Sequence, residues 1–261
     1  MRTRVARQPR MAAKEPRKPT KILSIDIGGS KVKYLATGET EPRKIPSGKE
    51  LSPARMVQKV RSTTRDWRYT AVSIGIPGPV GPNGALSEPG NLGPGWVGFD
   101  FAAAFECPVR IVNDAAMQAL GSYDGGRMLF LGLGTGVGSV LIIDHTVVPL
   151  ELGELAYKPD HTFSMRLGRQ ALEDKGKKRW RKRVLEVVPS LQRAFMADYV
   201  VLGGGNSKYL REPLPPNVRL GHNLTAFRGG YRLWGIEDMP THNVNGAKIP
   251  APQPPAEWRL V

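Results

Sequence analysis

The sequence contains a single cysteine, Cys107, among its 261 residues. One thiol forms no intrachain disulfide and supplies no cysteine cluster for a structural zinc site. The four histidines are scattered along the chain, so their spacing predicts no zinc site either. We therefore expect a protein of a reducing compartment, the cytoplasm, that holds no zinc.

Long apolar runs are also absent. No stretch approaches the roughly 18 residues that a membrane helix needs, and nothing near the start resembles the apolar region of a signal peptide. Hydrophobic residues make up 40% of the chain and charged residues 23%, a balance typical of globular rather than disordered proteins. The composition predicts a chain without membrane association that is long enough for one large or two small lobes.

Acidic residues are few, 23 against 38 basic ones, and the resulting net charge of +15 is concentrated in two segments. Residues 1–21 carry eight basic residues and one acidic residue, and residues 166–183 carry nine and two. Such patches are compatible with a nucleic-acid-binding protein. Trp180 is the only aromatic residue in them, however, so we expect no specific nucleic-acid partner.

Strand and helix patterns alternate along the chain. A strand, a glycine turn and a second strand occur at 22–36 and again at 128–143, which predicts two related α/β lobes. Apolar residues from 184 to 195 follow a helical period, with a kink or a break expected at Pro189. The predicted organisation is a disordered basic arm (1–20), an N-terminal lobe (21–113), a C-terminal lobe (114–238) and a proline-rich tail (239–261).

Three apolar strands are followed by glycine-rich turns. Glycines let backbone N–H groups approach phosphate oxygens closely. Asp26, at the end of the first strand, is a candidate ligand for a hydrated Mg²⁺ ion. Ordinary hairpin turns are the alternative for the first two turns, and a strand-to-helix connection for the third. The candidate phosphate-binding residues are Gly28, Gly29, Ser30, Lys31, Gly134, Thr135, Gly136, Gly203, Gly204, Gly205 and Asn206.

A polar pair, Asn113 and Asp114, follows the buried strand 109–112 where a helix is predicted to begin. Ligands in α/β folds bind at this end of a strand. There Asp114 can accept a proton from a substrate hydroxyl, while Asn113 hydrogen-bonds the substrate. The alternative for Asp114 is a helix N-cap.

Taken together, these motifs resemble the ROK family of sugar kinases (repressors, open-reading-frame proteins and kinases), and within it the polyphosphate-glucokinase branch. The resemblance covers residues 21–236. It implies a two-lobed actin-like fold, of the hexokinase and Hsp70 type, with duplicated sheet-and-helix lobes around a central cleft. The segments that carry it are Ile25–Ser30, Pro77–Pro79, Pro89–Leu92, Val112–Asp114, Leu133–Gly138, Glu151–Glu154 and Leu202–Asn206.

The resemblance implies a hexokinase-type kinase that transfers a phosphoryl group from ATP or polyphosphate to the 6-hydroxyl of a hexose such as glucose, with Mg²⁺. It makes Asp114 the general base and Asn91, Asn113, Glu151 and Glu154 the hexose ligands. It places phosphate at Gly28–Lys31 and Gly134–Gly136, and the nucleotide at Gly203–Asn206. Dimers are common among such proteins, so a homodimer is one alternative for the oligomeric state.

Two departures from the family pattern stand out. Glu154 occupies the position where most ROK kinases carry a histidine, and the cysteines of their zinc loop are missing. Glutamate can still accept hydrogen bonds from sugar hydroxyls, so a kinase remains the first hypothesis. A non-catalytic sugar- or nucleotide-binding protein is the alternative.

The basic run from Lys175 to Arg183 lies between the Glu151–Glu154 motif and the Gly203–Asn206 turn. An extended polyanionic donor would need positive charge beyond a compact nucleotide site. We predict that this run contacts such a donor, and a solvated helix face is the alternative.

Overall fold

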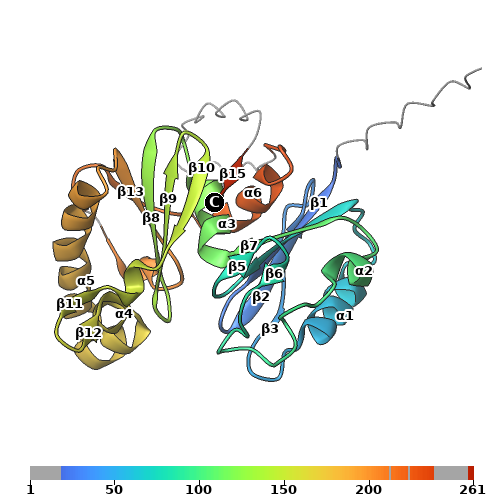
Figure 1. Ribbon diagram of the computed structural model, residues 1–261, viewed down its shortest axis with the longest axis horizontal. Coiled ribbons are helices and arrows are strands. Elements are labelled where there is room, and N and C mark those ends of the chain that lie inside the picture. The colour runs from blue at the N-terminus through green and yellow to red at the C-terminus, as the bar shows by residue number, and fades with distance from the viewer. Residues whose placement is uncertain (1–18, 212, 223, 238–257) are drawn as a thin grey trace, which may run out of the picture.

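The computed structural model describes residues 19–211, 213–222, 224–237 and 258–261. Most of the predicted arm (1–20) and most of the predicted tail (239–261) therefore lie outside the described residues. The described chain forms two lobes, each built on one large sheet, with helices α3 and α6 between them (Figure 1). No helix in these residues is long and apolar enough to cross a membrane.

The first sheet has the strand order β3-β2-β1-β4-β7. The first three strands form an antiparallel meander, and β4 and β7 then add parallel to β1. The strands are β1 (Ile22–Ile27), β2 (Lys31–Ala36), β3 (Arg43–Pro46), β4 (Ala71–Ile76) and β7 (Val109–Asn113).

The second sheet repeats this topology. An antiparallel meander of β8, β9 and β10 is followed by β13 and β14, which add parallel to β8. The strands are β8 (Arg127–Leu133), β9 (Val137–Ile143), β10 (Thr146–Leu150), β13 (Tyr199–Gly203), β14 (Val218–Leu220) and β15 (Arg259–Leu260). The duplicated lobes predicted from the two hairpin units are confirmed.

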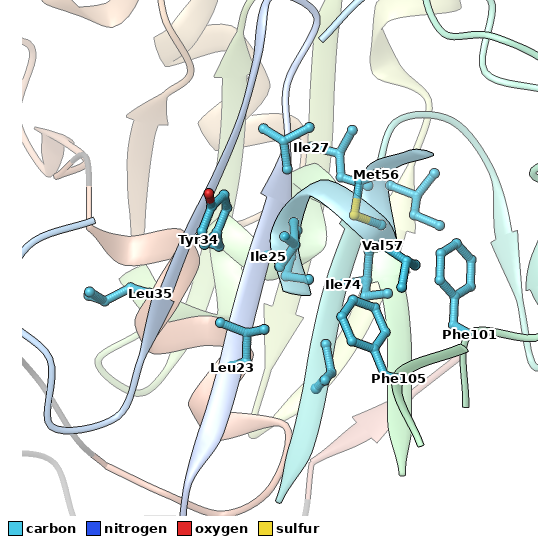
Figure 2. Packing of buried hydrophobic residues seen from close by; sticks show 14 of the residues in the cluster. Leu23, Ile25, Ile27, Tyr34, Leu35, Met56, Val57, Ile74, Phe101 and Phe105 are labelled. Atoms are coloured by element: carbon cyan, nitrogen blue, oxygen red, sulfur yellow. The ribbon is translucent and has the colours of Figure 1, made fainter. Parts of the chain in front are cut away.

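The alternation of side chains along β1 separates a core face from a cleft face. Leu23, Ile25 and Ile27 are fully buried and pack with α1 (Pro53–Thr63) and α2 (Phe101–Phe105), as Figure 2 shows. Because neighbouring residues of a strand point to opposite faces, Asp26 emerges on the other side. The two-residue alternation of the strand therefore places the carboxylate of Asp26 on the face that lines the cleft.

Two helices, α3 (Asp114–Ser122) and α6 (Thr225–Arg232), join the lobes. Their backbones touch, because a Cβ on Gly121 would lie 1.7 Å from the carbonyl oxygen of Thr225. Phe227 and Tyr231 of α6 are buried in the core of the first lobe. The chain thus returns to the first lobe after building the second.

The long helix α5 (Arg169–Ala194) runs through Pro189 without a break, so the break predicted there is wrong. Val184, Val188 and Leu191 are buried on one face of this segment, and their packing holds the helix across the proline. The irregularity lies instead at Gly176, whose φ of 73° is a left-handed conformation that glycine adopts readily.

The remaining elements are short. The strand-to-helix connection considered for Gly203–Gly205 does not lead into an α-helix, since a single 3₁₀ turn follows there. The last described residues form β15, which pairs with β10, so the predicted tail ends in a strand. The short elements are β5 (Val80–Gly81), β6 (Gly84–Ala85), η1 (Leu152–Glu154), β11 (Ala156–Lys158), β12 (His161–Thr162), α4 (Phe163–Leu167) and η2 (Ser207–Tyr209).

Candidate active site

A cleft of about 2400 Å³ is lined by residues of both lobes. It brings together all but one of the residues predicted for the site. The predicted residues that line it are Asp26, Gly28, Gly29, Ser30, Lys31, Asn91, Asn113, Asp114, Gly134, Thr135, Gly136, Glu151, Glu154, Gly203, Gly204 and Gly205. The exception is Asn206, which is buried behind the cleft wall.

Asp26 and Asp114 come together across Gly75. Asp26 pairs with Gly75 in the sheet register, and a Cβ on Gly75 would lie 3.2 Å from the Cα of Asp114. Only a residue without a side chain lets the start of α3 approach the sheet so closely. The sequence gives no sign of this role, because Gly75 sits inside an otherwise ordinary apolar strand.

Both carboxyl groups hold their protons more tightly than usual. Burial, and after it the charge of Asp26 and more weakly that of Glu151, raise the pKa of Asp114 to about 7. Burial likewise raises the pKa of Asp26 to about 6, against the opposing effect of Lys33. A carboxylate with a pKa near neutrality is suited to accept a proton from a substrate.

The side chain of Asn113 caps α3. Its Oδ1 accepts hydrogen bonds from the backbone N–H groups of Ala115 (2.9 Å) and Ala116 (3.2 Å). Its Nδ2 donates to the carbonyl oxygen of Gly78 at 2.9 Å. The N-cap residue of α3 is therefore Asn113 and not Asp114. One of the two side-chain N–H groups of Asn113 remains available for a substrate.

The glycine turns of the two lobes meet at the cleft. A Cβ on Gly29 would lie 3.1 Å from Nδ2 of Asn91 and 3.8 Å from Oγ1 of Thr135. The first turn is held by Ser47, whose hydroxyl donates to the carbonyl oxygen of Gly28 at 2.7 Å. The glycine turns of both lobes therefore border a common space.

The third glycine turn is tied to the second by Asn206. Its side-chain Nδ2 donates to the carbonyl oxygen of Gly134, and its backbone N–H donates to that of Leu133, both at 2.9 Å. Gly204 has a φ of 79°, and a Cβ there would lie 2.5 Å from the Leu133 carbonyl oxygen. Asn206, predicted to touch the nucleotide, thus positions the turn from behind.

Glu151 and Glu154 project from the second lobe and are exposed. Ser139 fixes their segment, because its hydroxyl donates to the carbonyl oxygen of Leu150 at 2.8 Å and accepts from the N–H of Leu152 at 3.0 Å. Burial and then the charge of Glu154 raise the pKa of Glu151. The two carboxylates line the cleft with Asp114 and offer acceptors for hydroxyl groups.

Comparison with known proteins gives the same assignment as these motifs. A model of the ROK family matches residues 22–149. Over this segment, somewhat less than half of its length, the chain is similar to the ROK family. It is 26% identical over 207 residues to a polyphosphate glucokinase of Mycobacterium leprae, a match that covers 70% of this chain. The match spans 63% of that relative's length, somewhat less than two thirds.

Solved structures share the fold of this protein. The inorganic polyphosphate/ATP-glucomannokinase of Arthrobacter sp. strain KM superposes with a TM-score of 0.66 at 22% identity, covering 81% of this chain and 96% of the other. A ROK family glucokinase of Streptomyces griseus, solved with glucose and AMPPNP, gives 0.63 at 15% identity, with coverage of 81% and 97%. The two-lobed actin-like fold is thereby established.

One residue outside the predicted set organises the Asn91 loop. The Glu88 carboxylate accepts hydrogen bonds from the backbone N–H groups of Trp96 (3.0 Å) and Val97 (3.3 Å). These bonds lower the pKa of Glu88, the one to Trp96 most strongly. The only sequence signal was its position directly before the Pro89–Leu92 motif.

Proposed function

We propose that this protein is a hexokinase-type phosphotransferase, which transfers a terminal phosphoryl group from polyphosphate or ATP to the 6-hydroxyl of a hexose, glucose in the first instance. The single observation that carries the proposal is the carboxyl group of Asp114. It is a partly buried group with a raised pKa, in a cleft that also holds three glycine turns and the carboxyl groups of Asp26, Glu151 and Glu154.

In the proposed reaction the hexose binds against Glu151 and Glu154, with Asn91 on the opposite lobe. Its 6-hydroxyl gives its proton to the ionised Asp114 as the oxygen attacks the terminal phosphorus in line. N–H groups of the turns at Gly28–Lys31 and Gly134–Gly136 hold the phosphate oxygens, and Lys31 offsets their charge. The leaving group is ADP or a polyphosphate chain shortened by one unit.

Mg²⁺ is the cation proposed for this chemistry, and Asp26 fits it. The Asp26 Oδ1 atom is buried and has no hydrogen-bond partner among the described residues, which suits an acceptor for a water of a hydrated ion. Mg²⁺ bound there would offset negative charge on the donor phosphates. The described residues hold no group of three or more histidine, cysteine, aspartate or glutamate side chains placed to bind a metal directly.

The decisive experiment offers the purified protein a panel of hexoses that includes glucose and mannose, with ATP and with polyphosphate as donors. Sugar phosphate is the measured product. In Asp114→Asn we expect turnover to fall by roughly 10²–10⁴, with the hexose still bound, because the proton acceptor is gone while the shape is kept. Near-normal turnover in this variant would refute the role of Asp114.

A matched control is Asp160→Asn. Asp160 is exposed in the turn between β11 and β12 and does not line the cleft. Its φ of 58° is one that asparagine also tolerates, so this variant should keep full turnover. Hexose binding without turnover on any donor would instead favour the non-catalytic sugar-binding alternative, for which Glu154 in place of the family histidine is the supporting observation.

A further inference from the structure

A second cavity, of about 980 Å³, lies between α5 and the turn η2. We call it the basic groove. Its described lining holds six cationic side chains and one carboxylate, Glu186, so it has a strong excess of positive charge. The lining residues are Lys177, Lys178, Arg181, Lys182, Leu185, Glu186, Lys208, Tyr209, Arg211 and Pro213.

The helix supplies its cations as one stripe. Lys177, Lys178, Arg181 and Lys182 follow a spacing of one, four and five residues, which places them on one face of α5. The break at Gly176 makes Lys177 and Lys178 the first residues of the following helical segment, whose N–H groups add partial positive charge. By contrast Lys175, Arg179 and Arg183, in the same basic run, do not line the groove.

Few carboxylates of the described residues neutralise this charge. Glu186 pairs with Arg166 at 3.3 Å and lies 3.9 Å from Lys182. Among the described residues, Lys177, Lys178 and Lys208 form no ion pair with a carboxylate. Such a cluster of like charges is unfavourable by itself and favours an anionic occupant.

The groove adjoins the cleft. Within the three-residue turn η2, Ser207 lines the cleft, whereas Lys208 and Tyr209 line the groove. Helix α5 makes the same connection, since Arg169 at its start lines the cleft. An extended ligand with one end at the Gly203–Gly205 turn can therefore continue over η2 into the groove.

The aromatic residues favour a chain without bases. Trp180, the one aromatic residue of the basic run, is fully buried, and its indole N–H donates to the carbonyl oxygen of Leu167 at 2.7 Å. The ring of Tyr209 already makes cation–π contacts with the ammonium groups of Lys177 and Lys208, which lie 4.9 and 5.0 Å from its centroid. Binding of single-stranded nucleic acid typically uses open aromatic faces for base stacking.

From this geometry we propose that the basic groove binds the distal part of a linear polyphosphate chain whose terminal unit occupies the cleft. The proposal rests on the phosphotransferase function proposed above and extends it. ATP, which ends at its nucleoside, does not need the groove. A polyphosphate chain presents about one negative charge per unit, and the groove offers that charge a continuous series of ammonium and guanidinium groups.

The test compares two triple variants that remove the same charge from the full chain. The groove variant is Lys177→Gln, Lys178→Gln, Lys208→Gln. The control variant is Lys175→Gln, Arg179→Gln, Arg183→Gln. These three residues lie in the same helix, α5, but outside the groove. Binding of linear polyphosphate of several tens of units is measured without hexose, by calorimetry, at 50 and 200 mM salt.

We expect the groove variant to lose at least tenfold in affinity at 50 mM salt, and the control variant less than threefold. The slope of log affinity against log salt should become shallower by about 2 in the groove variant, by analogy with the counterion release measured for single-stranded nucleic acids. Tripolyphosphate, which is no longer than the phosphate chain of ATP, should bind both variants and the unmodified protein alike.

Equal losses in both triple variants would overturn the proposal, because net charge alone would then explain binding. A single-stranded oligonucleotide that displaces polyphosphate and loses affinity in the groove variant to the same extent would assign the groove to nucleic acid instead. The measurement needs no turnover. If the protein phosphorylates no hexose but the groove variant still loses affinity for polyphosphate, the proposed phosphotransferase function is refuted. The assignment of the groove to polyphosphate then still holds.

Discussion

Asp26 and the backbone of Asp114 approach each other at a point where the sheet has no side chain: Gly75 pairs with Asp26, and its missing Cβ leaves room for the Cα of Asp114. Two partly desolvated carboxyl groups at such a place resist being ionised together. Burial first and the neighbouring charge second raise the pKa of Asp114 to about 7. The charge of Asp26 thus disfavours ionisation of Asp114, and the raised pKa sets the pH range in which Asp114 can act as a base.

The first prediction concerns the pH dependence of turnover. A base must be ionised to accept a proton, so kcat/KM should fall as the pH drops below about 7, the pKa of Asp114. Asp26→Asn removes the charge that disfavours ionisation of Asp114, so the midpoint of this acid limb should move to lower pH, whatever the loss in maximal rate. A pH–rate profile checks this, with Asp160→Asn as the control whose midpoint stays in place. An unmoved midpoint in Asp26→Asn would show that the charge of Asp26 does not influence the ionisation of Asp114.

The second prediction uses the same pKa without any activity. A carboxyl group whose folded pKa is raised favours the folded state at low pH, and this contribution is lost as the pH rises from about 4 to about 7. Asp114→Asn has no such charge to bury. We expect this variant to exceed the unmodified protein in free energy of unfolding by about 1–4 kcal/mol at pH 8, with the difference shrinking toward pH 4. Urea unfolding at both pH values measures it. A pH-independent difference would contradict the raised pKa.

The third prediction concerns the hexose side of the cleft. If Glu154 accepts hydrogen bonds from sugar hydroxyls, Glu154→Ala should weaken hexose binding by about 1–3 kcal/mol, because polar partners lose their acceptor. Glu173→Ala is the control, since Glu173 is exposed on α5 and does not line the cleft. Calorimetry with the hexose that supports turnover gives both values, and equal affinities would make Glu154 an ordinary surface charge.

The fourth prediction separates two neighbouring glycines. Gly204 has a φ of 79°, and a Cβ there would meet the Leu133 backbone at 2.5 Å, whereas a Cβ on Gly205 would meet nothing within 4 Å. Gly204→Ala should therefore lower the free energy of unfolding by about 1–3 kcal/mol or more, and Gly205→Ala should leave it nearly unchanged. Denaturant unfolding of both variants measures the contrast. Equal stabilities would mean that the turn adjusts without cost.

Local patterns carried much of the fold. The apolar alternation and glycine turns at 22–36 and 128–143 fixed both hairpins, because strand pairing across a short turn depends on near neighbours in the chain. The same reasoning from near neighbours in the chain failed at α5, where Pro189 predicted a break in the helix. Packing of Val188 and Leu191 against the second core outweighs that local preference, and only the tertiary fold contains this packing.

The candidate site divides in the same way. The residue types at 26, 114, 151 and 154 were legible in the sequence, because carboxylates after apolar strands or beside glycines are unusual enough to stand out. The sequence did not show which hydrogen-bond partner each polar residue of the site would have. Asn113 caps α3 and Asn206 ties two turns together, since their hydrogen bonds reach Gly78 and Gly134, tens of residues away.

The sequence by itself determined the order of strands and turns, the charged segments and the set of groups able to do chemistry. Tertiary structure alone decided that Asp26 and Asp114 share one environment, and that the basic run divides into residues that line a groove with Lys208 and residues that do not. The physical reason is that pKa values and electrostatic fields depend on distance and burial. Both quantities are set by contacts between segments far apart in the chain.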